Sequence, residues 1–373
     1  MHTIHLILSL ISCIAISSRR RSLLSLCRSI DYWQDNPEPT KEDIDIAKNI
    51  IATYLKQKPI SKCSNQEDWG LWQTFVEKDK IRYIELIDRG EVYGLATMLT
   101  SFMRNSGSIG LIEKGLLNRW GIKQNCAHVN AIYKLVSRAQ KYLDEIPSLS
   151  TLNLGSRIGN PYLVDIKGKK NSFSLINSQR YVYEFLSLVH LDFESKYNIL
   201  NIGGGFGGME FHLIRLLKQS TCVIVDLPQT LIFSFYYLSR QYPEKKISYF
   251  TGNGDLGSII DQNDVIFVPD WAAQKVPENY FDAVINRNAL ENIYRPNSLG
   301  YMGVISKVLK SKGSFFSNNL WQDEPRAIYK SEGHGIFSLL EESGELGNFS
   351  DPYFFLDREP KPSEVCSVAF KRL

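Results

Sequence analysis

The chain has 373 residues, enough for two domains, and its 43% hydrophobic and 22% charged content is typical of a soluble globular protein. The formal net charge is +3, but four arginines precede the first acid, Asp31, so the rest of the chain carries about −1 (+3 less those four). A near-neutral body argues against nucleic-acid binding, which requires a clustered basic footprint.

The six cysteines are scattered and form no C-x-x-C pair, which predicts reduced thiols in a reducing compartment. They are Cys13, Cys27, Cys63, Cys126, Cys222 and Cys366. The six histidines are also dispersed, with no HExxH pattern, so we expect no metal site. Together these features favour a cytoplasmic protein without a structural metal.

The N-terminus begins with a short apolar run, "IHLILSLISCIAIS", over residues 4–17. It is too short to span a bilayer comfortably, and its charges follow it, which is the wrong order for a secretory signal. A docked helix or an unstructured leader is the favoured interpretation. The alternative is a peripheral membrane contact through residues 4–21, with Arg19–Arg21 at lipid headgroups.

A breaker-rich linker, "DNPEPT", ends at Thr40, which we expect to cap a helix with acids in its first turn. Further helical patterns cover 67–87, 92–102, 128–143 and 178–189, whereas 154–174 is polar and predicted to be irregular. The predicted organisation is a leader (1–35), a helical N-terminal domain (36–150), a connecting segment (151–195) and an α/β domain (196–373).

From Asn198 onward the pattern alternates between strand and helix, which predicts a doubly wound, Rossmann-like α/β sheet with helices on both faces. The predicted strands are Ile199–Ile202, Cys222–Val225, Val265–Val268, Ala283–Asn286, Ser314–Ser317 and Val365–Phe370. Two β-like runs joined by a Pro/Lys turn close the chain, so we expect an antiparallel edge on a mostly parallel sheet.

Five glycines follow the first of these strands, in "NIGGGFGGME". Gly203, Gly205 and Gly208 match G-x-G-x-x-G, the dinucleotide fingerprint, while Gly203, Gly205 and Gly207 match G-x-G-x-G. Glycine permits positive φ in a tight turn and lets a ligand approach the backbone. The cluster alone leaves three ligands open: a nicotinamide dinucleotide, a nucleotide phosphate, or S-adenosylmethionine.

Asp226 follows the second strand, where a carboxylate can accept hydrogen bonds from two ribose hydroxyls. The alternative is that Asp226 caps the helix that begins in "LPQTLIFSFYYL". Asp226 therefore suits each of the nucleotide-containing ligands and does not separate them.

The segment "VIFVPDWAAQKVPENYFDAVINRNALENI" adds an acid, Asp270, after the third strand and a further strand entered by "FD". The order of these motifs, over residues 198–373, resembles class I S-adenosylmethionine-dependent methyltransferases. The resemblance implies that S-adenosylmethionine is bound, with Asp270 at the adenine amino group and Trp271 either on the adenine edge or in the core. The implied cofactor-binding residues are Gly203, Gly205, Gly207, Asp226, Asp270 and Trp271.

A narrower resemblance is carried by "RIGNPYLV", "INSQRYVYEFLSL", "VDLPQTLIFSFYYL" and "VINRNALENI". Together these segments are similar to the bacterial sugar O-methyltransferase family. That family implies O-methylation of a sugar hydroxyl in glycan or secondary-metabolite biosynthesis. In that family the motif after the fourth strand resembles N-S-x-S-F-x-E-M, where this chain has "NRNALENI". This chain keeps Asn286 and Glu291 but lacks the serines and the methionine, so it departs from the family pattern on the acceptor side.

Methyl transfer to a hydroxyl benefits from a positioned base, which contributes roughly 10²–10⁴-fold. The candidate catalytic residues are Glu291, His334 in "SEGHGIF", and Asn286, which could orient a hydroxyl. The competing interpretations are a solvated helix carboxylate, a loop histidine without a role and a strand-ending amide. His212, after the glycines, is predicted to pack or face solvent.

Two rival functions remain. One is a nicotinamide-dependent oxidoreductase, which the missing Tyr-x-x-x-Lys helix opposes because Pro243 interrupts the spacing from Tyr242 to Lys246. The other is a degenerate methyltransferase fold that binds without turnover. The expected partner is a small-molecule or glycan acceptor, with no nucleic acid and no stable membrane span.

Overall fold

The computed structural model describes residues 30–31, 37–61, 81–104, 156–161, 163–166, 169–320, 324–326, 331–333, 335–355 and 365–373. The predicted helix over 128–143, His334 and the apolar run over 4–17 lie outside these residues. In the described ranges no helix has the length and hydropathy needed to cross a membrane.

An eight-stranded sheet organises the C-terminal half in the order β12-β13-β9-β8-β4-β5-β7-β6. Its six parallel strands are β4 (Asn198–Ile202), β5 (Thr221–Asp226), β6 (Ile247–Tyr249), β7 (Val265–Pro269), β8 (Phe281–Arg287) and β9 (Leu309–Leu320). Two antiparallel strands, β13 (Val365–Lys371) and β12 (Tyr353–Phe354), complete the edge beside β9. The mostly parallel sheet and its antiparallel C-terminal edge are confirmed, and β6 is an additional edge strand that the pattern did not predict.

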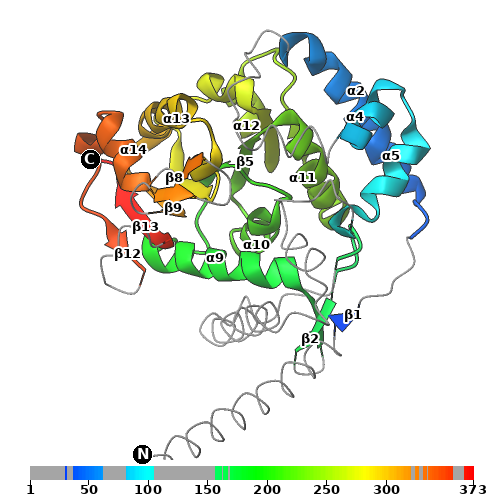
Figure 1. Ribbon diagram of the computed structural model, residues 1–373, viewed down its shortest axis with the longest axis horizontal. Helices are drawn as coiled ribbons and strands as arrows, with labels where there is room; N and C mark the ends of the chain where they lie inside the picture. Colours follow the sequence, from blue (N-terminus) through cyan, green and yellow to red (C-terminus); the bar gives the residue numbers. More distant parts are fainter. Residues whose placement is uncertain are drawn as a thin grey trace, which may run out of the picture.

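Helices cover both faces of this sheet, as the alternation predicted (Figure 1). One face packs against α9 (Phe173–Val189), α10 (Gly208–Leu216) and α11 (Pro228–Gln241). The other packs against α12 (Leu256–Asp261), α13 (Arg295–Val308) and α14 (Ile336–Glu342). Side chains on β5 alternate between these two cores, because successive residues of a strand point to opposite faces.

The N-terminal helices lie against α11, beside the sheet (Figure 1). They are α2 (Lys41–Ser61), α4 (Ile81–Asp88) and α5 (Val92–Leu99), followed by the 3₁₀ turn η2 (Phe102–Arg104). Thr40 caps α2 as predicted: its Oγ1 accepts from Asp43 N at 3.3 Å. Phe102 contacts Phe233 of α11 at 5.5 Å between ring centroids, so these helices share one core with the sheet face. The domain boundaries at 35, 150 and 195 stay predictions.

The prediction that 154–174 is irregular was wrong in part. Strands β2 (Leu163–Ile166) and β3 (Lys169–Ser172) form an antiparallel pair, and β1 (Ile30–Asp31) joins β2. Ser172 then caps α9, its Oγ accepting from Leu175 N at 3.4 Å, so the helix begins five residues before the predicted start. The lysines and asparagine of β3 have low strand propensity, so this pairing could not be predicted from composition.

Candidate functional site

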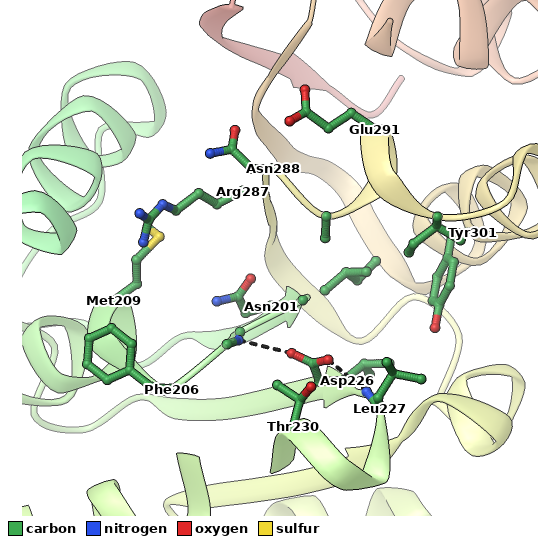
Figure 2. A pocket seen from close by; sticks show the side chains of 17 residues that line it. Asn201, Phe206, Met209, Asp226, Leu227, Thr230, Arg287, Asn288, Glu291 and Tyr301 are labelled. Atoms are coloured by element: carbon green, nitrogen blue, oxygen red, sulfur yellow. Dashed lines mark hydrogen bonds between the residues drawn. The ribbon is translucent and has the colours of Figure 1, made fainter. Parts of the chain in front are cut away.

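A cavity of about 290 Å³ lies at the carboxyl ends of β4, β5 and β8 (Figure 2). From β4 the chain continues to β5 on one side, while β8 lies on the other, so this is the topological switch point of the sheet. Ligands of open α/β sheets bind at that position. The cavity is lined by the glycine loop (residues 203–207), the end of β5, and residues 287–293 at and after the end of β8, which we call the β8 loop. Within the glycine loop the lining residues are 203–206, so the predicted cofactor-binding residue Gly207 is not among them.

The glycine loop depends on glycine for two physical reasons. Gly203, Gly205 and Gly207 all have positive φ, at +79°, +62° and +84°, a region that other residues rarely adopt. A Cβ on Gly203 would also lie 2.2 Å from the Cβ of Ala289 in the β8 loop. The loop therefore turns tightly and lies directly against the β8 loop, which closes one side of the cavity.

Asp226 connects the end of β5 to the glycine loop (Figure 2). Its Oδ2 accepts from Gly205 N at 3.0 Å, and its Oδ1 accepts from Leu227 N at 2.7 Å. Each carboxylate oxygen has two lone pairs, so the group has the capacity to accept from a ligand diol as well. The structure thus brings together Gly203, Gly205 and Asp226, which the sequence analysis singled out.

The β8 loop contributes charged and polar side chains to the opposite side of the cavity, with Arg287, Asn288 and Glu291 across from Asp226 (Figure 2). The Arg287 guanidinium lies 4.0 Å from the ring centroid of Tyr181 on α9, a cation–π contact that fixes its direction. Glu291 is only 7% exposed although it lines the cavity. This side can therefore present a carboxylate, an amide and a guanidinium to a bound molecule.

Asn286 lies at the base of the β8 loop and is fully buried. Its Nδ2 donates to Ser317 Oγ at 3.0 Å, and its Oδ1 accepts from Ala289 N and Leu290 N at 3.3 and 3.2 Å. These bonds hold the turn that presents Glu291 to the cavity. Asn286 itself is not one of the described residues that line the cavity.

Asp270 and Trp271 also do not occur among the described cavity-lining residues. They open the 3₁₀ helix η4 (Asp270–Lys275), where Trp271 packs 6.3 Å from Phe250 between ring centroids. Burial first, and then the charges of Asp270 and Asp226, raise the pKa of Tyr301 well above its usual value. Tyr301 lines the cavity, so Asp270 lies near its Tyr301 end.

Two ionisable residues of α10 are completely buried behind the glycine loop. Glu210 accepts a hydrogen bond from Asn201 Nδ2, and burial raises its pKa to about 7. His212 Nε2 lies 3.0 Å from the carbonyl oxygen of Leu175, and burial lowers its pKa to about 4. His212 is thus a packing residue, as expected. Sequence reasoning missed Glu210, although an acid in the apolar run "GMEFHLIRLL" was a visible signal.

In the part of the chain that the structure describes, no three His, Cys, Asp or Glu side chains gather as a metal site. Cys222 is a buried free thiol in β5, where it behaves as a small apolar residue.

No family model matches the sequence, and no match was found among curated proteins. Solved structures similar to part of the chain include the pyocyanin biosynthetic protein PhzM, with 14% identity, a TM-score of 0.36, and coverage of 54% of this chain and 58% of PhzM. The riboflavin-derivative dimethyltransferase RosA from Streptomyces davawensis is 16% identical, with a TM-score of 0.36 and coverage of 53% of this chain and 56% of RosA. Mitomycin 7-O-methyltransferase MmcR is 14% identical, with a TM-score of 0.34 and coverage of 54% of this chain and 57% of MmcR. The chain thus spans a little over half the length of each of these remote neighbours.

Proposed function

We propose that this protein is an S-adenosylmethionine-dependent methyltransferase that methylates a hydroxyl group, with a sugar as the acceptor. The observation that carries the proposal is the arrangement of one cavity at the switch point. The glycine loop and Asp226 form one side of it, and the β8 loop with Glu291 forms the other. A donor site and an acceptor site in contact are what methyl transfer requires.

The donor side suits a nucleoside. Asp226 offers a carboxylate to ribose hydroxyls, and the glycine loop allows close approach to the backbone. Bound S-adenosylmethionine supplies an electrophilic methyl group on a sulfonium leaving group. The protein then has to hold donor and acceptor in line and keep water out, which a site with a largely buried wall favours.

Two features favour this donor over a nicotinamide dinucleotide. The antiparallel strand β13 lies beside β9, whereas the dinucleotide-binding sheet is built from two parallel halves. The cavity, at about 290 Å³, is also just below the roughly 300–1,000 Å³ usual for ligand pockets. That volume suits a ligand of nucleoside and amino-acid size better than a dinucleotide.

Glu291 is our candidate general base on the acceptor side. Its carboxylate lines the cavity, and the Asn286 hydrogen bonds hold the turn that carries it. Arg287 and Asn288 of the same loop are placed to orient an acceptor hydroxyl. The sugar assignment is supported by the sequence resemblance, and His334 stays a second predicted base outside the described residues.

Calorimetric titration tests the donor assignment. We expect S-adenosylmethionine and S-adenosylhomocysteine to bind, NADH not to bind, and Asp226→Ala to weaken donor binding about 10- to 100-fold through lost charge-assisted hydrogen bonds. The matched control is Asp264→Ala. Asp264 directly precedes β7 and accepts from Lys246 N at 2.8 Å, at the amino ends of the strands and away from the cavity. NADH binding alone would contradict the proposal. Donor binding without turnover on any glycan would support the degenerate-fold rival instead.

A further inference from the structure

An acid–amide pair, Asn201 and Glu210, lies directly behind the glycine loop. Asn201 belongs to β4 and lines the cavity, and its Nδ2 donates to Glu210 Oε1. A Cβ on Gly204 would lie 3.6 Å from both of these atoms. The carboxyl group of Glu210 is therefore separated from the cavity only by the thickness of the loop.

Each member of this pair has a second buried oxygen that lacks a hydrogen-bond partner. Asn201 Oδ1 and Glu210 Oε2 are both inaccessible to solvent, in residues that are 3% and 1% exposed. Both oxygens are acceptors when Glu210 is ionised, so neither can satisfy the other. A protonated Glu210 has the O–H donor that Asn201 Oδ1 lacks. The pair is therefore better satisfied when Glu210 is protonated than when it is ionised.

The charges around Glu210 are few and oppose one another. Burial raises the pKa of Glu210 to about 7, while the hydrogen bond from Asn201, its own backbone N–H and the Arg287 charge lower it, and Asp226 raises it. On α10 itself His212 is neutral near pH 7, because burial lowers its pKa to about 4. The Cys222 thiol of β5, Tyr237 of α11 and Ser178 of α9 are neutral neighbours of this end of α10. Two further arginines lie on these helices, Arg215 on α10 and Arg180 on α9, where Arg180 pairs with Glu184.

A cation placed in the cavity changes this balance. S-adenosylmethionine carries a positive sulfonium, whereas its product S-adenosylhomocysteine is a neutral thioether. A positive charge across the loop favours the ionised carboxylate, and by linkage the ionised carboxylate favours the cation equally. For charges separated by one loop in a partly buried site, the effect is about tenfold in affinity.

We propose that Glu210 is the residue that makes this site prefer its cationic donor to its neutral product, by losing a proton to solvent when the donor binds. The inference rests on the proposed function. In this step the O–H bond of a protonated Glu210 breaks when the donor binds, and the proton goes to a buffer base in solution. After methyl transfer the positive charge is gone, so Glu210 takes a proton back and the product is held less tightly. Glu210 is thus a specificity-determining residue that does not touch the acceptor.

Calorimetry on the whole chain tests this inference. We expect wild-type affinity for S-adenosylmethionine to rise about fivefold from pH 6 to pH 8.5 through Glu210, with no such contribution for S-adenosylhomocysteine. In Glu210→Gln, which keeps an amide partner for Asn201, this contribution disappears. Glu194→Gln, the same change at an exposed acid, keeps it. The donor amino group also titrates, so the difference between wild type and Glu210→Gln isolates the Glu210 contribution.

A second measurement needs no variant. Titrations of wild type at pH 6.5 in two buffers with different ionisation enthalpies count the protons released. A one-unit change in the Glu210 pKa predicts about half a proton released with the donor and none with the product. Equal proton counts for the two ligands, or the same pH profile in Glu210→Gln, would overturn the inference while leaving the methyltransferase proposal intact. Failure of both ligands to bind would overturn both.

Discussion

Two carboxylates are buried on the same side of the sheet and differ in how they are partnered. Asp43, on α2, is 2% exposed, and it accepts from Thr40 N at 2.8 Å, Thr40 Oγ1 at 2.7 Å and Tyr236 OH at 2.8 Å. Arg240 Nε lies 2.8 Å from its Oδ1. Glu210, 1% exposed, accepts from Asn201 and has one buried oxygen without a partner.

The difference separates a structural acid from a responsive one. Burial of an ionised carboxylate is tolerated when hydrogen bonds and an opposite charge replace water, as at Asp43. Asp43 thereby joins the N-terminal helices to α11. Glu210 lacks those partners, so its protonation follows whatever charge enters the cavity beside it. We infer that a poorly satisfied acid behind a cavity marks function, whereas a fully satisfied one between helices marks stability.

The largest effect is expected from Asp43→Ala. Removing this acid takes the shared acceptor from Thr40 and Tyr236. Arg240 keeps its ion pair with Glu42. Hydrogen bonds to a charged group are worth about 1.5–3 kcal/mol each, so we expect a loss of about 3–5 kcal/mol of unfolding free energy. Urea unfolding measures it. Asp45→Ala removes an exposed ion pair with Lys48 and should cost less than about 1 kcal/mol. Similar losses in the two variants would show that Asp43 is not a structural anchor.

Glu210→Gln should stabilise the protein, and only at higher pH. The Glu210 pKa is raised from 4.5 to about 7 on folding, so its contribution to stability is complete below pH 4.5 and is lost as pH rises through 7. Glutamine does not titrate, so the variant should gain about 3 kcal/mol over wild type at pH 8 and almost nothing at pH 4.5. Thermal unfolding across this range measures the gain. A gain independent of pH would contradict a titrating Glu210.

His212, two residues further along α10, should act with the opposite sign. Its pKa is lowered from 6.5 to about 4, so its contribution is complete above pH 6.5 and is lost as pH falls through 4. It should account for about 2 kcal/mol of stability lost between pH 8 and pH 5. His212→Asn should remove that share of the acid sensitivity, measured by chemical unfolding at both pH values. The matched change at exposed His190 should leave it in place.

The smallest effect is expected from Tyr236→Phe, which removes one of the partners of Asp43. Loss of a hydrogen bond to a charged group costs about 1.5–3 kcal/mol, and the remaining partners should keep the loss near 1.5. Tyr353→Phe, at a side chain that is 54% exposed, is the control and should change stability little. If Tyr236→Phe were as damaging as Asp43→Ala, the hydroxyl and not the network would hold the helices.

The fold could be predicted well because its signals are local. Apolar strands and amphipathic helices are each recognised from residues close together in the sequence, and the glycines mark the turn after β4. The β2–β3 pair was missed because its pairing depends on a neighbour and not on strand propensity.

The site could be predicted only in part. Asp226 was found because a strand end locates it beside the glycine loop. The contacts of Asn286 with Ser317, of Arg287 with Tyr181, and of Asn201 with Glu210 join residues brought together by folding. No spacing rule connects these pairs, so a single sequence cannot reveal which polar side chain completes another.

Hydrogen exchange with and without S-adenosylmethionine tests the central claim most directly. The account predicts slower exchange in peptides covering residues 201–209, 225–230 and 286–293, which surround the cavity. The surface groove between α2 and the end of α11 should be unaffected. Unchanged exchange around the cavity, or protection confined to that groove, would contradict a donor site at the glycine loop.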